Sequence, residues 1–337
     1  MAMYPVLSYP QTACPSAATA SSSFYGNRKP QAAPTDSQED NYMKRTGRIL
    51  FCLLPLLLTI GLQNLVSIPA FGISAILTIL QNYPSGTLAG IYEKLFALWT
   101  SSTFTIGISV LYAVTALAVF GFWYAKKLAD DQEQVPVRQA FNWQIVLAML
   151  LLAVGLQYVT TYLMNFVALL RPDWMRAYEA LLETAGFDSV SPLLAIYSCL
   201  IAPLSEELIF RGVTLGYGKK AMPVIPAVCL QAVLFGVFHM NIIQGIYAAF
   251  IGLFLGYVCE TGGTVAVPVL LHAFFNLIGT SFNSLLFYRM EQPFFFLLWL
   301  TTGVLLTFTG IFLFQYGVQR RDLSLAPDVT AQNQEPS

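Results

Sequence analysis

The sequence predicts an all-α membrane protein, a multi-pass bundle of about eight transmembrane helices with a disordered N-terminal tail. Hydrophobic residues make up 56% of the 337 residues and charged residues only 10%, whereas a soluble protein carries about 25% charged residues. About eight long apolar runs follow one another, and each reaches the roughly 17–25 residues that a helix needs to cross a bilayer. These runs lack the polar residue at every third or fourth position that marks an amphipathic soluble helix.

The chain divides into five segments. Residues 1–43 are rich in Ser, Ala, Pro, Gln and Tyr without a hydrophobic period, so they cannot bury enough surface to offset the entropy of ordering. We expect this tail, and the C-terminal tail 318–337, to be disordered. Between them we expect N-terminal transmembrane helices over 44–189, a core block over 190–287 and a last transmembrane helix over 288–317. The core block carries nearly all the conspicuous polar residues, and the first three runs carry almost none.

In chain order, the apolar runs cover residues 49–70, 103–125, 144–170, 190–218, 221–240, 242–259, 263–287 and 293–316. A further apolar piece, residues 71–80, either lies in the membrane interface or extends the first helix. Short turns around Lys220 and Thr261 join consecutive runs, and short turns make antiparallel neighbours.

The distribution of Lys and Arg predicts the orientation, because cytoplasmic ends carry the excess of these residues. With the N-terminus inside, the cytoplasmic side collects Lys44, Arg45, Arg48, Lys126, Lys127, Arg138, Lys219, Lys220, Arg320 and Arg321. The opposite side collects only Lys94, Arg171, Arg176 and Arg289. We therefore expect an integral membrane protein in contact with the lipid bilayer, with both termini in the cytoplasm.

Composition also excludes some functions. The net charge of −1 supplies no basic face, so nucleic acid is not an expected partner. Five scattered cysteines without a CxxC pair predict neither a disulfide framework nor a thiolate metal site. The only two histidines both lie in apolar runs. The sequence indicates no oligomeric state.

Three ionisable side chains stand close together in the run 190–218. Each costs at least about 2.5 kcal/mol in hydrocarbon, so their presence needs a reason. Glu207 and Arg211 are four residues apart, share a helix face and can pair. Glu206 is rotated by about 100° and has no such partner in its own helix. The spacing therefore predicts one structural carboxylate and one that is left for chemistry.

Two histidine motifs complete the polar set. Phe235 precedes His239, and His272 precedes Asn276, by four residues, which places each pair on one helix face. Counted at 1.5 Å per residue from the two short turns, Glu206, His239 and His272 stand about 21, 28 and 17 Å above the same side of the bundle. The three groups fall within a layer about 11 Å deep, which permits one site.

Such a site can hydrolyse a peptide bond. The Glu206 carboxylate can take a proton from water, and a neutral imidazole can share that proton and deliver it to the leaving amine. A second imidazole and the Asn276 carboxamide can donate hydrogen bonds to the developing oxyanion. Alternatively, Glu206, His239 and His272 ligate a zinc ion that activates the water. The HExxH spacing typical of zinc peptidases is absent, and neither histidine has a clear carboxylate partner. Zinc and a metal-free mechanism both stay open.

The three motifs resemble those of the CAAX-protease and bacteriocin-processing (CPBP, or Abi) intramembrane peptidases, which include type II prenyl-protein endopeptidases. The resemblance covers about residues 190–287 and rests on the patterns EExxxR at 206–211, FxxxH at 235–239 and HxxxN at 272–276. It implies an endopeptidase, metallo or glutamic, in which Glu206 and His239 activate water.

The resemblance further implies that His272 and Asn276 stabilise the oxyanion and that a peptide or protein substrate reaches the site from the membrane. Relatives that act on prenylated proteins open to the cytosol, whereas the depth count places His239 toward the other face. The side of opening therefore stays undecided.

Two other functions remain as alternatives. A non-catalytic immunity or scaffold protein of the same family would keep the site as a relic or as a binding pocket. A proton- or metal-coupled transporter also uses intramembrane Glu and His, although transporters often show paired repeats, and here the polar residues fall in one block.

Overall fold

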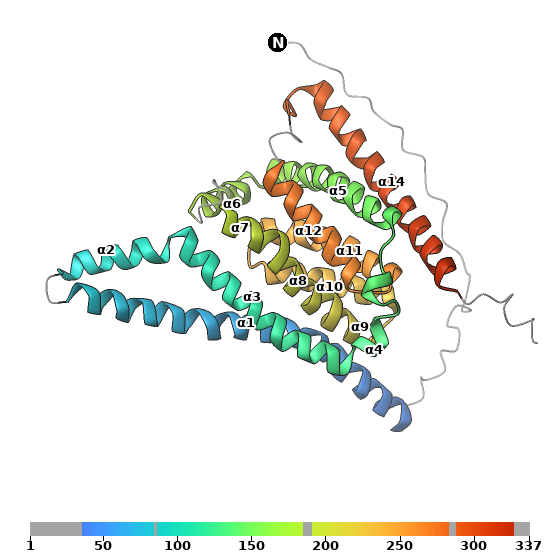
Figure 1. Cartoon of the computed structure of the whole chain (residues 1–337), viewed down its shortest axis with the longest axis horizontal. Coiled ribbons are helices and arrows are strands. Elements are labelled where there is room, and N and C mark those ends of the chain that lie inside the picture. The colour runs from blue at the N-terminus through green and yellow to red at the C-terminus, as the bar shows by residue number, and fades with distance from the viewer. Residues whose placement is uncertain (1–35, 84–85, 185–190, 283–287, 327–337) are drawn as a thin grey trace, which may run out of the picture. The chain divides into compact units, whose positions relative to one another are not determined.

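A computed structural model describes residues 36–83, 86–184, 191–282 and 288–326. Within these residues every regular element is helical (Figure 1), which confirms the predicted all-α membrane fold. Residues 44–337 form one compact unit. Most of the predicted N-terminal tail, residues 1–35, lies outside the described residues. Residues 36–43 of that tail are helical, as the start of the first helix.

The elements and their bounds, in chain order, are α1 (Asp36–Asn82), α2 (Leu88–Trp99), α3 (Ser102–Lys127), α4 (Ala129–Gln132), η1 (Val137–Gln139), α5 (Trp143–Leu170), α6 (Pro172–Thr184), α7 (Pro192–Ile196), η2 (Tyr197–Ile201), α8 (Ala202–Glu207), η3 (Leu208–Thr214), α9 (Leu215–Ala221), α10 (Val224–Phe238), α11 (Ile242–Gly262), α12 (Ala266–Ser281) and α14 (Pro293–Leu325). Segments α7 to α9 follow one another without a break and form a single apolar span, Pro192–Ala221.

Six helices in the described residues are long and apolar enough to cross a membrane: Gly47–Asn82 of α1, α3, α5, the span Pro192–Ala221, α11 and α14. The predicted spanning length is wrong for the other two runs. Helix α10 has 15 residues and α12 has 16, so each rises only about 22–24 Å. Met240, at a φ of 55°, and the N-cap Asn241 end the α10 run early.

Helix α1 runs without interruption through residues 71–80. This apolar piece therefore extends the first helix, which is one of the two predicted alternatives. Helices α2 and α6 were not predicted, because at 12 and 13 residues they are too short to register as spans.

The last helix continues past the predicted boundary at residue 317, to Leu325. Residues 318–325 are therefore helical, whereas the sequence predicted disorder for them. The reason is Arg321, which is 5% exposed and donates through Nη1 to the carbonyl oxygen of Gly262 at 2.8 Å. That bond satisfies a carbonyl at the C-terminus of α11, where orphan carbonyls need a partner.

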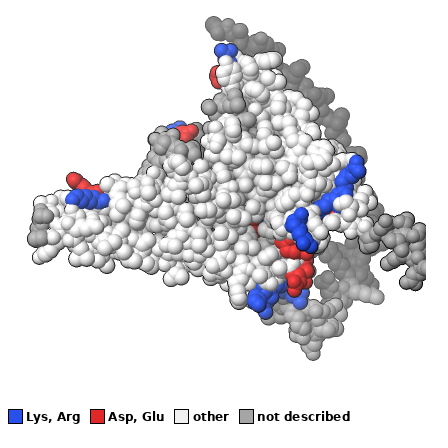
Figure 2. Space-filling view, in the orientation of Figure 1, with Lys and Arg blue, Asp and Glu red and all other residues white. Residues whose placement is uncertain are grey.

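The helix ends that were predicted to share one membrane side lie together. Arg48 Nη1 donates to the carbonyl oxygen of Lys220 at 3.1 Å, which joins the start of α1 to the end of α9. Lys220 pairs with Asp131 at 2.6 Å and Lys219 with Glu260 at 2.8 Å. Figure 2 shows the charged residues in small groups separated by broad uncharged surface. The grouping agrees with the predicted alternation of the spans, and the cytoplasmic orientation stays a prediction.

Candidate active site

Two π-helical segments flank the paired carboxylates. Segment η2 precedes α8, which carries Glu206 and Glu207, and segment η3 follows it. A π-turn inserts extra residues into a helix and leaves backbone carbonyls without their usual partners, and such turns often occur at functional sites. Side-chain amides from other elements fill both gaps. Asn276 Nδ2 donates to the carbonyl oxygen of Ser198 at 2.7 Å, and Gln132 Nε2 donates to that of Gly212.

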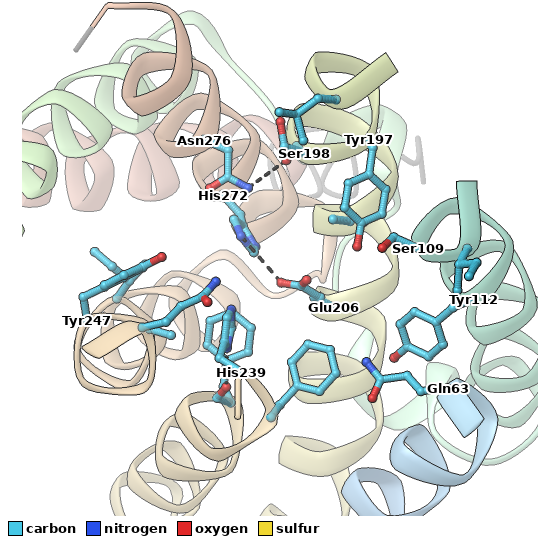
Figure 3. A pocket seen from close by; sticks show the side chains of 18 of the residues that line it. Gln63, Ser109, Tyr112, Tyr197, Ser198, Glu206, His239, Tyr247, His272 and Asn276 are labelled. Carbon is cyan, nitrogen blue, oxygen red and sulfur yellow. Dashed lines mark hydrogen bonds and ion pairs between the residues drawn. The ribbon is translucent and has the colours of Figure 1, made fainter. Parts of the chain in front are cut away.

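A cavity of about 540 Å³ opens beside α8. Its wall includes four of the predicted site residues, which are Glu206, His239, His272 and Asn276. Figure 3 shows these four side chains around the same space, although they come from α8, α12 and the end of α10. The other two predicted residues, Glu207 and Arg211, do not line the cavity and are fully buried behind it.

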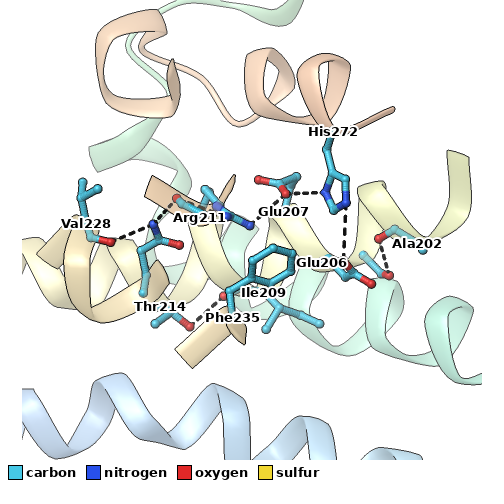
Figure 4. Close-up of polar contacts among 12 residues, drawn as sticks. Ala202, Glu206, Glu207, Ile209, Arg211, Thr214, Val228, Phe235 and His272 are labelled. Atoms are coloured by element: carbon cyan, nitrogen blue, oxygen red, sulfur yellow. Dashed lines mark hydrogen bonds and ion pairs between the residues drawn. The ribbon is translucent and has the colours of Figure 1, made fainter. Parts of the chain in front are cut away.

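Glu207 is bonded on two sides. Its Oε1 atom accepts a hydrogen bond from Arg211 Nη1 at 2.9 Å and another from His272 Nδ1 at 2.7 Å (Figure 4). The ion pair predicted from the four-residue spacing therefore forms. The expectation that neither histidine has a carboxylate partner is wrong, because Glu207 is the partner of His272. This contact joins residues 65 positions apart, so it depends on the packing of α12 and not on local spacing.

The hydrogen bonds fix the tautomer of each histidine. Glu207 is the acceptor for His272 Nδ1, and a backbone carbonyl, that of Phe235, lies 2.8 Å from His239 Nδ1. Because a carbonyl can only accept, Nδ1 of His239 is the protonated nitrogen. In the neutral imidazoles, Nε2 of both rings then carries the lone pair. Both rings thus offer a proton acceptor to the cavity.

Glu206 faces one of these acceptors. Its Oε2 atom lies 3.8 Å from His272 Nε2, which is too long for a direct hydrogen bond. A water molecule placed beside both atoms can bridge a separation of this length. The Glu206 side chain is 13% exposed and that of His272 is 8% exposed. The pair is therefore enclosed, yet open to one small molecule.

Arg211 is held from three directions. In addition to Glu207, its Nη2 atom donates to the carbonyl oxygen of Gly252 at 3.4 Å, and its guanidinium carbon lies 4.4 Å from the centre of the Phe235 ring. Gln231 Nε2 donates to the same Gly252 carbonyl at 2.8 Å. A buried cation needs such partners, although within the described residues Nε of Arg211 has none. Phe235 thus packs between Arg211 and the cavity.

The sequence analysis missed polar residues on the first helices. Gln63 and Ser67 of α1 and Ser109 and Tyr112 of α3 line the cavity opposite Glu206. The signal is the spacing of four residues in the first pair and of three in the second, which puts each pair on one helix face. Without the neighbouring helices in view, each pair resembled the scattered polar residues of an ordinary span.

Tyr197 was also missed, for a different reason. It precedes Glu206 by nine residues, and in a regular α-helix two such residues lie on opposite sides. The π-turn of η2 begins at Tyr197, and one inserted residue turns the helix by about 100°. The side chain therefore reaches the same cavity, where it lies beside Ser109 (Figure 3).

The predicted zinc ligands do not form a metal site as arranged. Within the described residues, no group of three His, Cys, Asp or Glu side chains is placed to hold one metal ion. Glu206, His239 and His272 share a cavity without converging on one point. Zinc and a metal-free mechanism therefore both stay predictions.

The fold and the cavity define a class, the multi-pass helical membrane proteins that enclose a carboxylate and two imidazoles within their spans. Residues 188–278 match the family model of type II CAAX prenyl endopeptidases, described as Rce1-like. Residues 188–278 are therefore similar to the CAAX-protease (CPBP) family, a family of proteases, as the three motifs indicated. The match covers under a third of the chain and includes all six predicted site residues. No curated protein and no solved structure matches the chain.

Proposed function

We propose that the protein is an intramembrane endopeptidase in which Glu206 and the two histidines activate a water molecule against a peptide carbonyl. The observation that carries the proposal is the convergence of Glu206, His239, His272 and Asn276 on one cavity of about 540 Å³. Polar groups inside a membrane protein are costly and usually functional. The match of residues 188–278 to the model of a protease family supports the same interpretation.

The first step is proton removal from water. A water between Glu206 Oε2 and His272 Nε2 would contact both acceptors, which lie 3.8 Å apart. Glu206 takes the proton as the water oxygen attacks the carbonyl carbon. Nε2 of His239, which carries a lone pair on the cavity side, accepts the second water proton, the hydroxyl proton of the tetrahedral intermediate, and passes it to the leaving amine. The peptide C–N bond then breaks, which yields a carboxylate and an amine.

The second requirement is stabilisation of the oxyanion. Asn276 commits one amide hydrogen to the carbonyl oxygen of Ser198 and keeps a second donor. His272 donates from Nε2 after Glu206, 3.8 Å away, has passed it the first water proton, and the buried Glu207 carboxylate beneath it stabilises that imidazolium. The Tyr197 hydroxyl, which also lines the cavity, is a further donor. Donors fixed in place before the reaction contribute the largest electrostatic share of catalysis.

The substrate we propose is a peptide segment held at the membrane by a lipid modification. The name of the matching family specifies CAAX prenyl endopeptidases, and the cavity is enclosed by apolar spans. A segment anchored in the bilayer would reach the cavity without leaving the membrane.

The test is cleavage by the purified protein in lipid vesicles. The substrate is an isoprenylated peptide that ends in a CAAX sequence, and mass spectrometry detects release of the terminal tripeptide. Glu206→Ala and His239→Ala should each abolish release. Glu260→Gln is the matched control, because it removes a carboxylate that pairs with Lys219 away from the cavity, and it should cleave at the parent rate.

Two outcomes would contradict the proposal. Full activity of either Ala variant would remove that side chain from the mechanism. If no lipidated or unmodified peptide is cleaved, and the folded Glu206→Ala protein still supports the cellular role of the parent, the non-catalytic scaffold is the better description. Solute flux across the same vesicles would instead favour a transporter.

A further inference from the structure

A second cavity adjoins the first one. This side cleft has a volume of about 290 Å³ and lies between α5, α6, α11 and α12. Its lining residues are Gln157, Thr160, Thr161, Met164, Asn165, Tyr178, Tyr247, Phe275, Asn276, Gly279 and Thr280. Tyr247 and Asn276 also line the larger cavity. The two cavities therefore meet at these two side chains.

The side cleft has many polar lining residues and no charged one, although most of its accessible surface is apolar. Eight of its eleven lining residues carry a hydroxyl or a carboxamide, and none is ionisable at neutral pH. On α5 the lining residues recur at intervals of three and four, from Gln157 to Asn165, which marks one helix face. A polar face on a spanning helix requires a partner, because lipid supplies no hydrogen bonds.

Protein contacts satisfy only part of this face. Gln157 Nε2 donates to the carbonyl oxygen of Phe275 at 2.6 Å, and Thr161 Oγ1 donates to that of Gln157 at 2.9 Å. Thr160 is 7% exposed, and its hydroxyl has no hydrogen-bond partner within the described part of the chain. A buried hydroxyl of this kind calls for an ordered water.

The size of the side cleft suits water as well. At about 30 Å³ per molecule, it would hold on the order of ten waters, each of which needs two to four polar partners. Uncharged hydroxyls and carboxamides that both donate and accept provide such partners.

We propose that the side cleft is a water-filled route that supplies hydrolytic water to the active cavity while a substrate occupies that cavity. Each cleavage consumes one water, and a peptide seated in the larger cavity displaces the water that filled it. A replacement would arrive from behind the substrate by passing between Tyr247 and Asn276, the two side chains that both cavities share. The role as a supply route rests on the proposed peptidase function, whereas the presence of water in the cleft does not.

The experiment measures water access first. Thr161→Cys and Thr280→Cys place a thiol on opposite walls of the side cleft. Val159→Cys is the control, because it lies two positions from Thr161 on α5, is partly exposed and does not line the cleft. A small charged methanethiosulfonate reacts only with the thiolate, whose formation a dry apolar site suppresses. Labelling is counted in excess of the parent protein, which has its own cysteines.

We expect both cleft thiols to react at least about tenfold faster than the control thiol, because each pKa unit of thiol desolvation costs about a factor of ten in thiolate. Equal rates at all three positions would show a dry cleft and overturn the proposal. This arm needs no peptidase activity, so its failure is separate from failure of the proposed function.

The second part measures the supply of water. The adduct at Thr161→Cys narrows the side cleft, and kcat of the labelled protein on the isoprenylated peptide should fall about tenfold while KM stays within about twofold. Thr161→Ser, which keeps the hydroxyl, should match the parent. A labelled protein with parental kcat would show that the cleft holds water without supplying it, and a rise in KM alone would assign the cleft to peptide binding. Either result overturns the proposal.

Discussion

Replacing Arg211 with methionine removes one partner of a fully buried ion pair. Arg211 and Glu207 are both 0% exposed, and Met keeps most of the buried volume without the charge. The Glu207 carboxylate then stays buried with only His272 as a donor. Breaking a buried pair from one side costs about 3–5 kcal/mol of folding stability, because the remaining charge is uncompensated. We expect Arg211→Met to lose stability in this range.

The double variant Glu207→Gln with Arg211→Met separates charge from shape. It removes both charges, so most of the lost stability should return, since replacing both members of a buried pair is often close to neutral. The carboxamide that replaces the Glu207 carboxylate can still accept from His272 Nδ1, but a neutral amide does not stabilise an imidazolium. We therefore expect a folded protein whose cleavage rate stays low. Unfolding by SDS titration in mixed micelles gives the stabilities, and peptide release gives the rates.

The opposite pattern would refute this reasoning. If the double variant is as unstable as Arg211→Met, the cost comes from lost packing against Phe235 and not from an unpaired charge. If the double variant cleaves at the parent rate, the Glu207 charge has no part in the reaction.

Further predictions concern packing and metal. A Cβ atom on Gly252 would lie 3.0 Å from Ala232 Cα. Gly252→Ala should therefore lower the unfolding free energy by about 1–3 kcal/mol in an SDS titration. Gly107→Ala is the control and should leave it unchanged, because a Cβ atom there would have nothing within 4 Å. Gln132→Met leaves the π-helical carbonyl of Gly212 unsatisfied and should cost about 1–3 kcal/mol in the same titration. Chelation of the purified protein should leave peptide release unchanged, because no three described ligand side chains are placed to hold one ion. Loss of release on chelation, restored by one zinc per chain, would contradict this prediction.

Much of the fold could be predicted, because the thickness of the bilayer sets the number of apolar residues that a spanning helix needs. The placement of α3, α5 and α14 follows from hydropathy alone. A search for apolar runs of spanning length does not detect shorter helices. For this reason α2 and α6 were missed, and α10 and α12 were predicted too long. The end of α14 was misplaced because Arg321 looked like a solvent-exposed charge, whereas it bonds to a carbonyl of α11.

In the candidate site, too, local contacts could be predicted from the sequence and tertiary contacts could not. The pairing of Glu207 with Arg211 is local, and a spacing of four residues predicts it. The bond from His272 to Glu207 is set by tertiary packing, so it was absent from the prediction. Tyr197 depends on a π-turn, which breaks the 3.6-residue period on which helix-face arguments rest. The spacing of the polar residues of α5 from Gln157 onward indicates a polar helix face, but the sequence analysis did not predict it because the Glu and His motifs were more conspicuous.

The most direct measurement of the central claim, that Glu206 activates water inside the membrane, is the cleavage rate of Glu206→Gln in lipid vesicles on an isoprenylated peptide. Gln preserves the shape of the side chain and cannot accept the proton. We predict that kcat falls by about a thousandfold or more, since general-base catalysis contributes about 10²–10⁴, while peptide binding and stability match those of Glu260→Gln. A Glu206→Gln protein that cleaves within a few-fold of the parent would contradict the account.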